Sequence, residues 1–80
     1  MIFYPKTELE LYDICEKICE KAHTIKVILH DKTVIEGTVY GFTSAVNNEP
    51  EIAEIDIKLK NGQLTGAFQD EIESIEILEG

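Results

Sequence analysis

The sequence predicts a mainly β protein: a small, strongly bent, five-stranded antiparallel barrel preceded by an N-terminal α-helix. Apolar residues recur at three- and four-residue steps in the first quarter of the 80-residue chain and at alternate positions afterwards. Five short strands joined mostly by tight turns favour a sheet that curls into a barrel. We expect one domain over residues 1–80, with a helix at about 7–22 and the barrel at about 25–78.

The predicted helix has a start signal and an apolar stripe. Thr7 can cap the N-terminus, and Glu10 completes a capping box three residues later. The stripe consists of Leu11, Ile14, Cys15, Ile18, Cys19 and Ala22. A helix with a single apolar side is suited to covering one open end of a barrel.

The expected strands are residues 25–30, 33–42, 52–59, 63–68 and 75–78. Asp31-Lys32 and Asn61-Gly62 predict tight turns, of which Asn61-Gly62 is the stronger hairpin signal. Gly37 and Gly41 lie in the longest strand, where glycine permits a sharp bend or a close approach to another backbone. The fourth and fifth strands are short and apolar, and we expect them to leave open edges to which another subunit adds a strand.

Composition and charge exclude several function classes. The chain has 7 lysines, no arginine and 16 acidic residues, for a net charge of -9. Such a charge disfavours non-specific binding of nucleic acid or an anionic membrane. No apolar run reaches the roughly 18 residues of a membrane span, and the first residues do not form a secretory signal. We therefore expect a cytoplasmic protein that does not bind membranes.

The size of the chain favours self-association. A domain this small rarely gains more than about 3–5 kcal/mol from its own core. Two cysteines do not make a disulfide framework. A homo-oligomer is therefore expected before any motif is considered.

The segment 37–47, Gly-Thr-Val-Tyr-Gly-Phe-Thr-Ser-Ala-Val-Asn, is the most specific part of the sequence. It resembles the first signature motif of the Sm-like (LSm) family, with Val46 in place of the usual Met. The matching positions are Gly37, Val39, Gly41, Phe42 and Asn47. Leu64-Thr65-Gly66 falls where the second motif of that family, Arg-Gly or Lys-Gly after apolar residues, would fall.

The resemblance implies a non-catalytic binding module with an Sm-like or SH3-like barrel that forms homo-oligomeric rings through its edge strands. It also implies a face for single-stranded RNA, formed by the 43–49 loop and a Thr65-Gly66 turn. The RNA-contacting positions of the family would be Asn47, Thr43, Ala45, Thr65 and Gly66, while Gly37, Gly41 and Phe42 are structural. Thr43 replaces an Asp, Ala45 an aromatic residue or His, and Thr65 a basic residue. The implied RNA face is therefore degenerate, because a lost stacking partner alone removes about 1–3 kcal/mol per base.

A second resemblance, in architecture and charge, is to the Rho-inhibitor (Rof) family. That family has an acidic Sm-like barrel behind an N-terminal helix and binds a protein. It implies an alternative function for this chain, namely an acidic regulator, monomeric or dimeric, that docks a basic protein partner.

Other candidate chemistry has simpler explanations. Cys15, Cys19 and His23 are spaced along one helix stripe, but Cys15 and His23 would be about 12 Å apart along the axis and cannot share a metal. We interpret the cysteines as small apolar residues of the buried face, and we expect no metal, no cofactor and no enzymatic activity. Asn47 either reads a ligand or bonds its own loop. The acidic stretch is either a solvated strand face or a dock for a basic protein surface, and comprises Asp70, Glu71, Glu73, Glu76 and Glu79.

Overall fold

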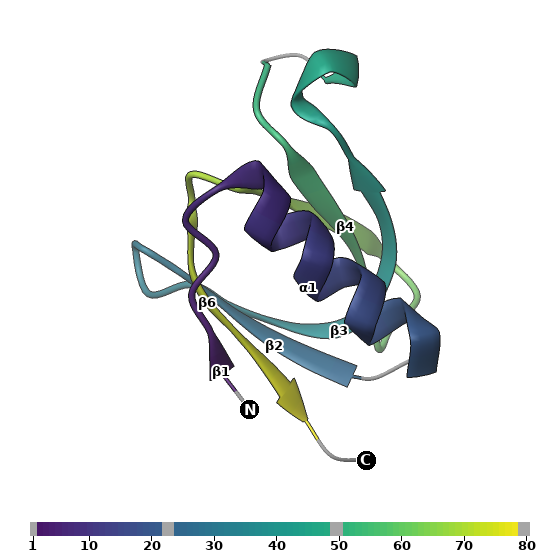
Figure 1. Cartoon of the computed structure of the whole chain (residues 1–80). Coiled ribbons are helices and arrows are strands. Elements are labelled where there is room, and N and C mark those ends of the chain that lie inside the picture. Colours follow the sequence, from purple (N-terminus) through teal and green to yellow (C-terminus); the bar gives the residue numbers. More distant parts are fainter. Residues whose placement is uncertain (1, 22–23, 49–50, 79–80) are drawn as a thin grey trace.

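The computed structural model describes residues 2–21, 24–48 and 51–78 and combines one helix with a curled antiparallel sheet (Figure 1). The elements are β1 (Ile2–Phe3), α1 (Glu8–Lys21), β2 (Thr24–Leu29), β3 (Val34–Thr43), the 3-10 helix η1 (Ala45–Asn47), β4 (Glu54–Leu59), β5 (Leu64–Phe68) and β6 (Ile72–Leu78). The predicted fold class, a mainly β domain with an N-terminal helix, is confirmed.

The sheet has six strands in the order β1-β6-β2-β3-β4-β5 over the described residues. The sequence analysis missed β1, which pairs Ile2 with Glu76 and Phe3 with Ile75 of β6. The expectation that the fifth predicted strand leaves an open edge is therefore wrong, because β1 lies on that edge. A two-residue strand shows no periodicity, so only its backbone pairing reveals it. The last strand also begins earlier than expected, at Ile72.

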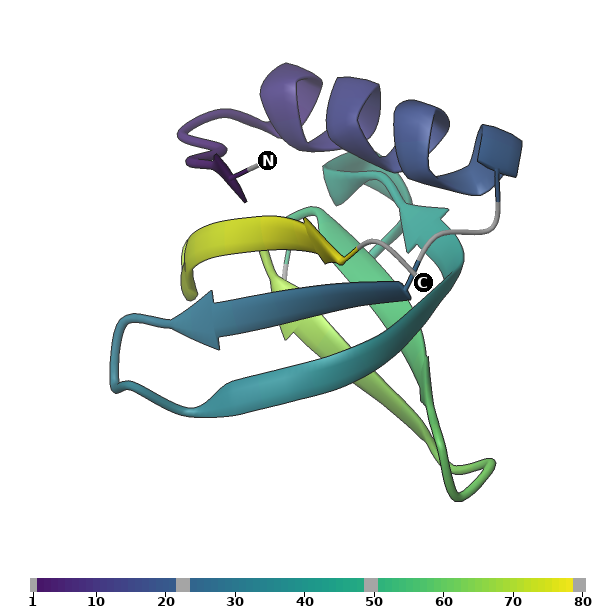
Figure 2. The same ribbon diagram turned by 90° about the horizontal axis from the view of Figure 1, so that it is seen from below.

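Helix α1 lies across one side of the curled sheet, as Figure 2 shows. The Thr7 hydroxyl oxygen accepts a hydrogen bond of 3.1 Å from the backbone N–H of Glu10. The Glu10 carboxylate accepts from the backbone N–H of Lys6 at 2.8 Å, one residue before the position expected for a capping box. The predicted Thr7 cap is thus present, whereas the reciprocal bond of the capping box goes to Lys6 instead of Thr7. Within the described residues, no helix is long and apolar enough to span a membrane.

The core lies between α1 and the concave face of the sheet. It contains Leu11, Ile14, Cys15, Ile18, Ile25, Val27, Ala53, Ile55, Ile57, Ala67, Ile72 and Ile75. The helical stripe of α1 and the alternation along β2 and β4 predict most of these residues. Ala67 of β5 and Ile72 and Ile75 of β6 complete the core and were not predicted individually. The side chains of Cys19 and Ala22, also expected in the core, lie outside the described part of the chain.

The bend of β3 depends on Gly37. At this point the strand passes from one partner to the other, because Gly37 pairs with Ile25 of β2 and with Leu59 of β4. A Cβ atom on Gly37 would collide with the backbone carbonyl oxygen of Lys58. The strand is further bent by a register shift between Val39 and Gly41. A Cβ atom on Gly41 would lie 3.5 Å from the Asp56 carboxylate, which is an ordinary contact.

We therefore predict that Gly37→Ala lowers the free energy of unfolding by about 1–3 kcal/mol, because the added methyl group forces β3 and β4 apart. The matched variant Gly41→Ala changes it by less than about 1 kcal/mol. Urea denaturation of both variants followed by circular dichroism measures the difference. Equal losses would show that the close approach at Gly37 does not determine the bend.

Candidate functional site

The structure brings together only part of the predicted site. Thr43 is the last residue of β3, and Ala45 and Asn47 lie in η1, which follows it. These three residues therefore lie close together where the chain leaves β3 towards β4. Thr65 and Gly66 are instead inside β5, paired with Ile57 and Asp56. The expected Thr65-Gly66 turn is therefore wrong, because β alternation continues through these residues.

The turn that follows β5 is the one that approaches the β3–β4 loop. The backbone N–H of Gln69 donates to the carbonyl oxygen of Ala53 at 2.8 Å. We call the region formed by residues 43–48, 51–53 and 69–71, together with the first turn of α1, the loop end of the barrel. Of the RNA-contacting positions implied by the Sm-like resemblance, it contains Thr43, Ala45 and Asn47, whereas Thr65 and Gly66 lie in β5.

Asn47 has a role inside its own loop. Its side-chain amide donates to the Ser44 hydroxyl at 3.1 Å, and its backbone N–H donates to the Ser44 carbonyl at 3.1 Å. The side chain is exposed at the surface. These contacts correspond to the loop-structuring interpretation of Asn47.

Asn48 spans the same loop. Its amide donates to the carbonyl oxygen of Ile52 at 2.9 Å and to the Glu54 carboxylate at 3.4 Å. These bonds connect the residue after η1 with the start of β4. Asn48 was not singled out from the sequence, because side-chain to backbone bonding within a loop leaves no periodic signal.

Helix α1 holds the end of β3. The Glu8 carboxylate accepts a hydrogen bond of 3.3 Å from the backbone N–H of Ala45. The rings of Tyr12 and Phe42 meet edge to face, with centroids 5.3 Å apart at 65°. A hydrogen bond to Glu16, together with its negative charge, raises the pKa of Tyr12.

Carboxylates dominate the polar contacts of the loop end. Glu8 holds Ala45, Glu54 holds Asn48, and Glu71 accepts from the backbone N–H of Phe68 at 3.2 Å. The Glu54 carboxylate also lies directly over Gly66, where a side chain of any size would displace it. In the part of the chain that the structure describes, no lysine side chain makes a polar contact with the loop end. The arrangement therefore presents negative charge.

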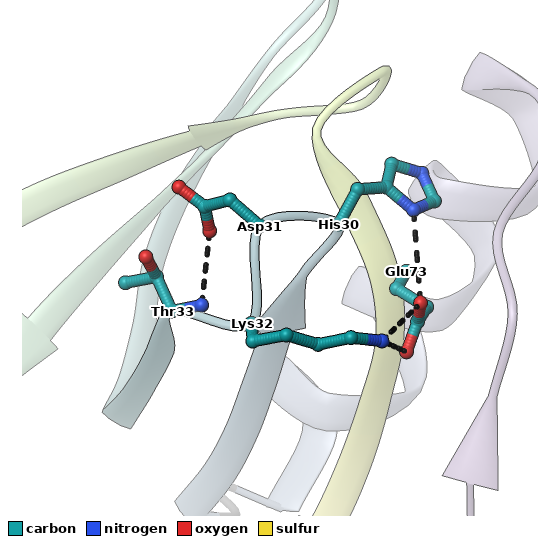
Figure 3. Close-up of polar contacts among 5 residues, drawn as sticks. All are labelled: His30, Asp31, Lys32, Thr33 and Glu73. Atoms are coloured by element: carbon teal, nitrogen blue, oxygen red, sulfur yellow. Dashed lines mark hydrogen bonds and ion pairs between the residues drawn. The ribbon is translucent and has the colours of Figure 1, made fainter.

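A second polar cluster lies at the β2–β3 hairpin (Figure 3). The Glu73 carboxylate lies 3.2 Å from Nζ of Lys32 and 3.9 Å from Nδ1 of His30. A groove of about 660 Å³ lies beside this cluster and is lined by Tyr4, Pro5, Lys6, His30, Gln69, Asp70, Ile72 and Glu73. Both basic and acidic side chains line this groove, so its charge favours neither a cationic nor an anionic ligand. Sequence reasoning missed this groove because its walls come from the N-terminal arm and two separate turns.

The candidate metal ligands do not form a site in the described residues. Cys15 is buried in the core, while the side chains of Cys19 and His23 lie outside the described part of the chain. Among the described residues, no three histidine, cysteine or acidic side chains come together in a way that could hold a metal ion. The acidic C-terminal stretch is divided between the loop end, where Glu71 lies, and the hairpin cluster, where Glu73 lies. Glu79 is outside the described residues.

The two predicted turns have the same construction. In each, a leucine (Leu29 or Leu59) exchanges backbone hydrogen bonds across a three-residue loop whose last residue has positive φ. That residue is Lys32 in the first turn, with φ of 75°, and Gly62 in the second, with φ of 90°. In the first turn the Asp31 carboxylate accepts a hydrogen bond of 2.9 Å from the backbone N–H of Thr33. In the second, the Asn61 side-chain oxygen accepts one of 2.9 Å from the backbone N–H of Gln63. Hydrogen bonds from the Thr33 hydroxyl and backbone N–H lower the pKa of Asp31.

We predict opposite sensitivities for the two neighbouring asparagines. Asn48→Ala should lower the free energy of unfolding by about 1 kcal/mol, because two partly buried acceptors lose their donor. Asn47→Ala should change it by less than about 0.5 kcal/mol, because its partner Ser44 is bonded at the surface. Thermal and urea unfolding of the two variants measure the difference. A larger loss for Asn47→Ala would contradict this assignment.

We also predict that the Asp31 carboxyl group titrates below its ordinary pKa. Its folded-state pKa is lowered, so its hydrogen bonds to Thr33 stabilise the turn fully above the unfolded-state pKa of about 4, and this contribution is lost as the pH falls through the folded-state pKa. NMR titration of the side-chain carboxyl carbon measures the value. Asp31→Asn, which copies Asn61 of the second turn, should keep the turn and remove this pH dependence. A normal Asp31 pKa would contradict the hydrogen bonding.

Comparisons with known proteins extend the structural findings. No family profile matches the sequence, and no curated protein matches it. The fold is similar to the crystal structure of XC5848 from Xanthomonas campestris, described as a novel variant of the Sm-like motif, with a TM-score of 0.60 and 13% sequence identity. The similarity covers 99% of this chain and 94% of that one. The chain therefore has an Sm-like fold.

Proposed function

We propose that the protein is a non-catalytic Sm-like binding module that recognises a basic surface of another protein, without a metal or cofactor. The observation that carries this proposal is the negative charge of the loop end, where Glu8 and Glu71 accept from backbone N–H groups and Glu54 accepts from the Asn48 side-chain amide. A cationic partner complements such a surface and is attracted to it over a longer range than the contact itself. The alternative function implied by the resemblance to the Rof family likewise pairs an acidic protein with a basic partner.

RNA is disfavoured at the same place. Of the family's usual RNA-contacting residues only Asn47 is present, and its amide is bonded to Ser44. The carboxylates around it repel phosphate, and binding of RNA depends on cations that neutralise phosphates. Ala45 offers no ring on which a base could stack.

The strands at the two edges of the sheet, β1 and β5, determine where another copy of the chain could add a strand. Edge strand β5 carries Leu64, which is 57% exposed, whereas β6 is paired with β1 at Ile75 and Glu76. A ring joined edge to edge through β6 requires β1 to leave its place. We therefore propose a monomer or dimer. A homo-oligomeric ring remains the second candidate, supported by the open edge of β5.

Three measurements on the full-length chain test the proposed function. In fluorescence anisotropy at about 0.1 M salt, labelled oligolysine should bind and weaken as salt increases, whereas labelled oligo-U and oligo-A should not bind. Light scattering on a sizing column should give a monomer or dimer. Binding of oligo-U without binding of oligolysine would overturn the proposal, and a stable ring would favour the second candidate.

A pair of charge variants tests where oligolysine binds. The double variant Glu51→Gln, Asp70→Asn removes two charges at the loop end and should weaken binding about threefold or more. The control Asp31→Asn, Glu36→Gln removes the same charge elsewhere and should have a smaller effect. Equal losses would mean that only the net charge matters and would contradict a specific acidic docking surface.

A further inference from the structure

We propose that the groove between α1 and the end of β3 docks a basic segment of a partner protein that also carries an apolar side chain. This inference rests on the proposed function and adds to it the surface and the chemistry of the segment. The groove has a volume of about 440 Å³ and is lined by Glu8, Leu9, Tyr12, Phe42 and Ser44.

Apolar side chains at the groove are left uncovered by the fold. Leu9 is 68% exposed and Tyr12 is 43% exposed, although α1 buries a full stripe on its other side. Leu9, Tyr12 and Glu16 follow one another at three- and four-residue steps, so they share one face of the helix. Val46, two residues after the groove residue Ser44, is 86% exposed. An uncovered group of large apolar side chains is typical of an interaction surface.

The walls of the groove are fixed before any partner arrives. The Glu8 carboxylate joins the first turn of α1 to the backbone of Ala45, and the Tyr12 ring packs against the edge of Phe42. Glu16, four residues further along the same helix, is close enough to the Tyr12 hydroxyl to raise its pKa. Because these side chains are already ordered, docking loses less conformational entropy than it would on a mobile surface.

Charge complementarity selects the occupant. Glu8 lines the groove, Asp13 and Glu16 are close enough to Tyr12 to act on it electrostatically, and no lysine lines the groove. The acidic loop end of a second copy of the chain does not complement this groove, because it carries the same negative charge. RNA is repelled for the same reason. A segment with Lys or Arg pairs with these carboxylates and can place a cation over the Tyr12 ring, while an apolar side chain covers Leu9.

The test uses two labelled peptides, one with Lys and Leu at helical spacing and one in which Ser replaces every Leu. The Lys–Leu peptide should bind the full-length protein more tightly than the Lys–Ser peptide. On binding, NMR shifts should appear at Leu9, Tyr12, Phe42 and Ser44. Leu9→Ser should weaken binding of the Lys–Leu peptide about tenfold. The control Leu64→Ser replaces a similarly exposed leucine on β5 and should leave binding unchanged.

The outcomes separate this inference from the proposed function. If both peptides bind equally, if the shifts lie elsewhere, or if Leu9→Ser and Leu64→Ser have the same effect, the groove is not the docking site while the acidic binding function stands. If neither these peptides nor oligolysine bind, the proposed function and the inference are both overturned. Urea unfolding of Leu9→Ser verifies that the variant is folded, as expected for an exposed position.

Discussion

The close approach of β3 and β4 at Gly37 is the constraint on which the architecture depends. Here the longest strand leaves its pairing with β2 and continues with β4, and the Lys58 carbonyl lies where a side chain would be. This corner lets the sheet curl over its own core. It also directs the end of β3 towards α1, so that Phe42 meets Tyr12 and the loop end forms beside the helix.

The carboxylates of the loop end have two effects that cannot be separated. As acceptors, Glu8 and Glu71 satisfy backbone N–H groups that the strands and turns leave without partners. As charges, they determine which molecules can approach. In this protein the loops at that end of the fold are held by anions. Any molecule that meets the loop end therefore meets the same carboxylates that hold its loops.

Much of this structure could be predicted from the sequence, because its signals are local or periodic. The stripe from Leu11 to Ile18, the Thr7 cap and the alternation of Ile55 and Ile57 each depend on residues a few positions apart. The two turns were predicted for the same reason. The long strand was also predicted to extend to Phe42, and it ends one residue later, at Thr43.

What could not be predicted depends on contacts between distant segments. Strand β1 exists because its backbone meets β6, 70 or so residues away, and two residues cannot show a pattern. The turn that the Sm-like resemblance implied at Thr65-Gly66 is wrong, whereas the strand that alternation predicted over residues 63–68 is present as β5. The groove at Leu9 combines a helix with a strand end, and neither segment alone indicates a hollow.

The short strand β1 also has a consequence for the solubility of the folded protein. It covers the middle of β6, at Ile75 and Glu76, and leaves the flanking parts of the described strand outside its two-residue ladder. A foreign strand that approaches this side meets no continuous row of open backbone groups, so this edge is protected from edge-to-edge pairing, whereas β5 leaves the opposite edge open. The two residues of β1 thus protect one of the two sheet edges from pairing with a foreign strand.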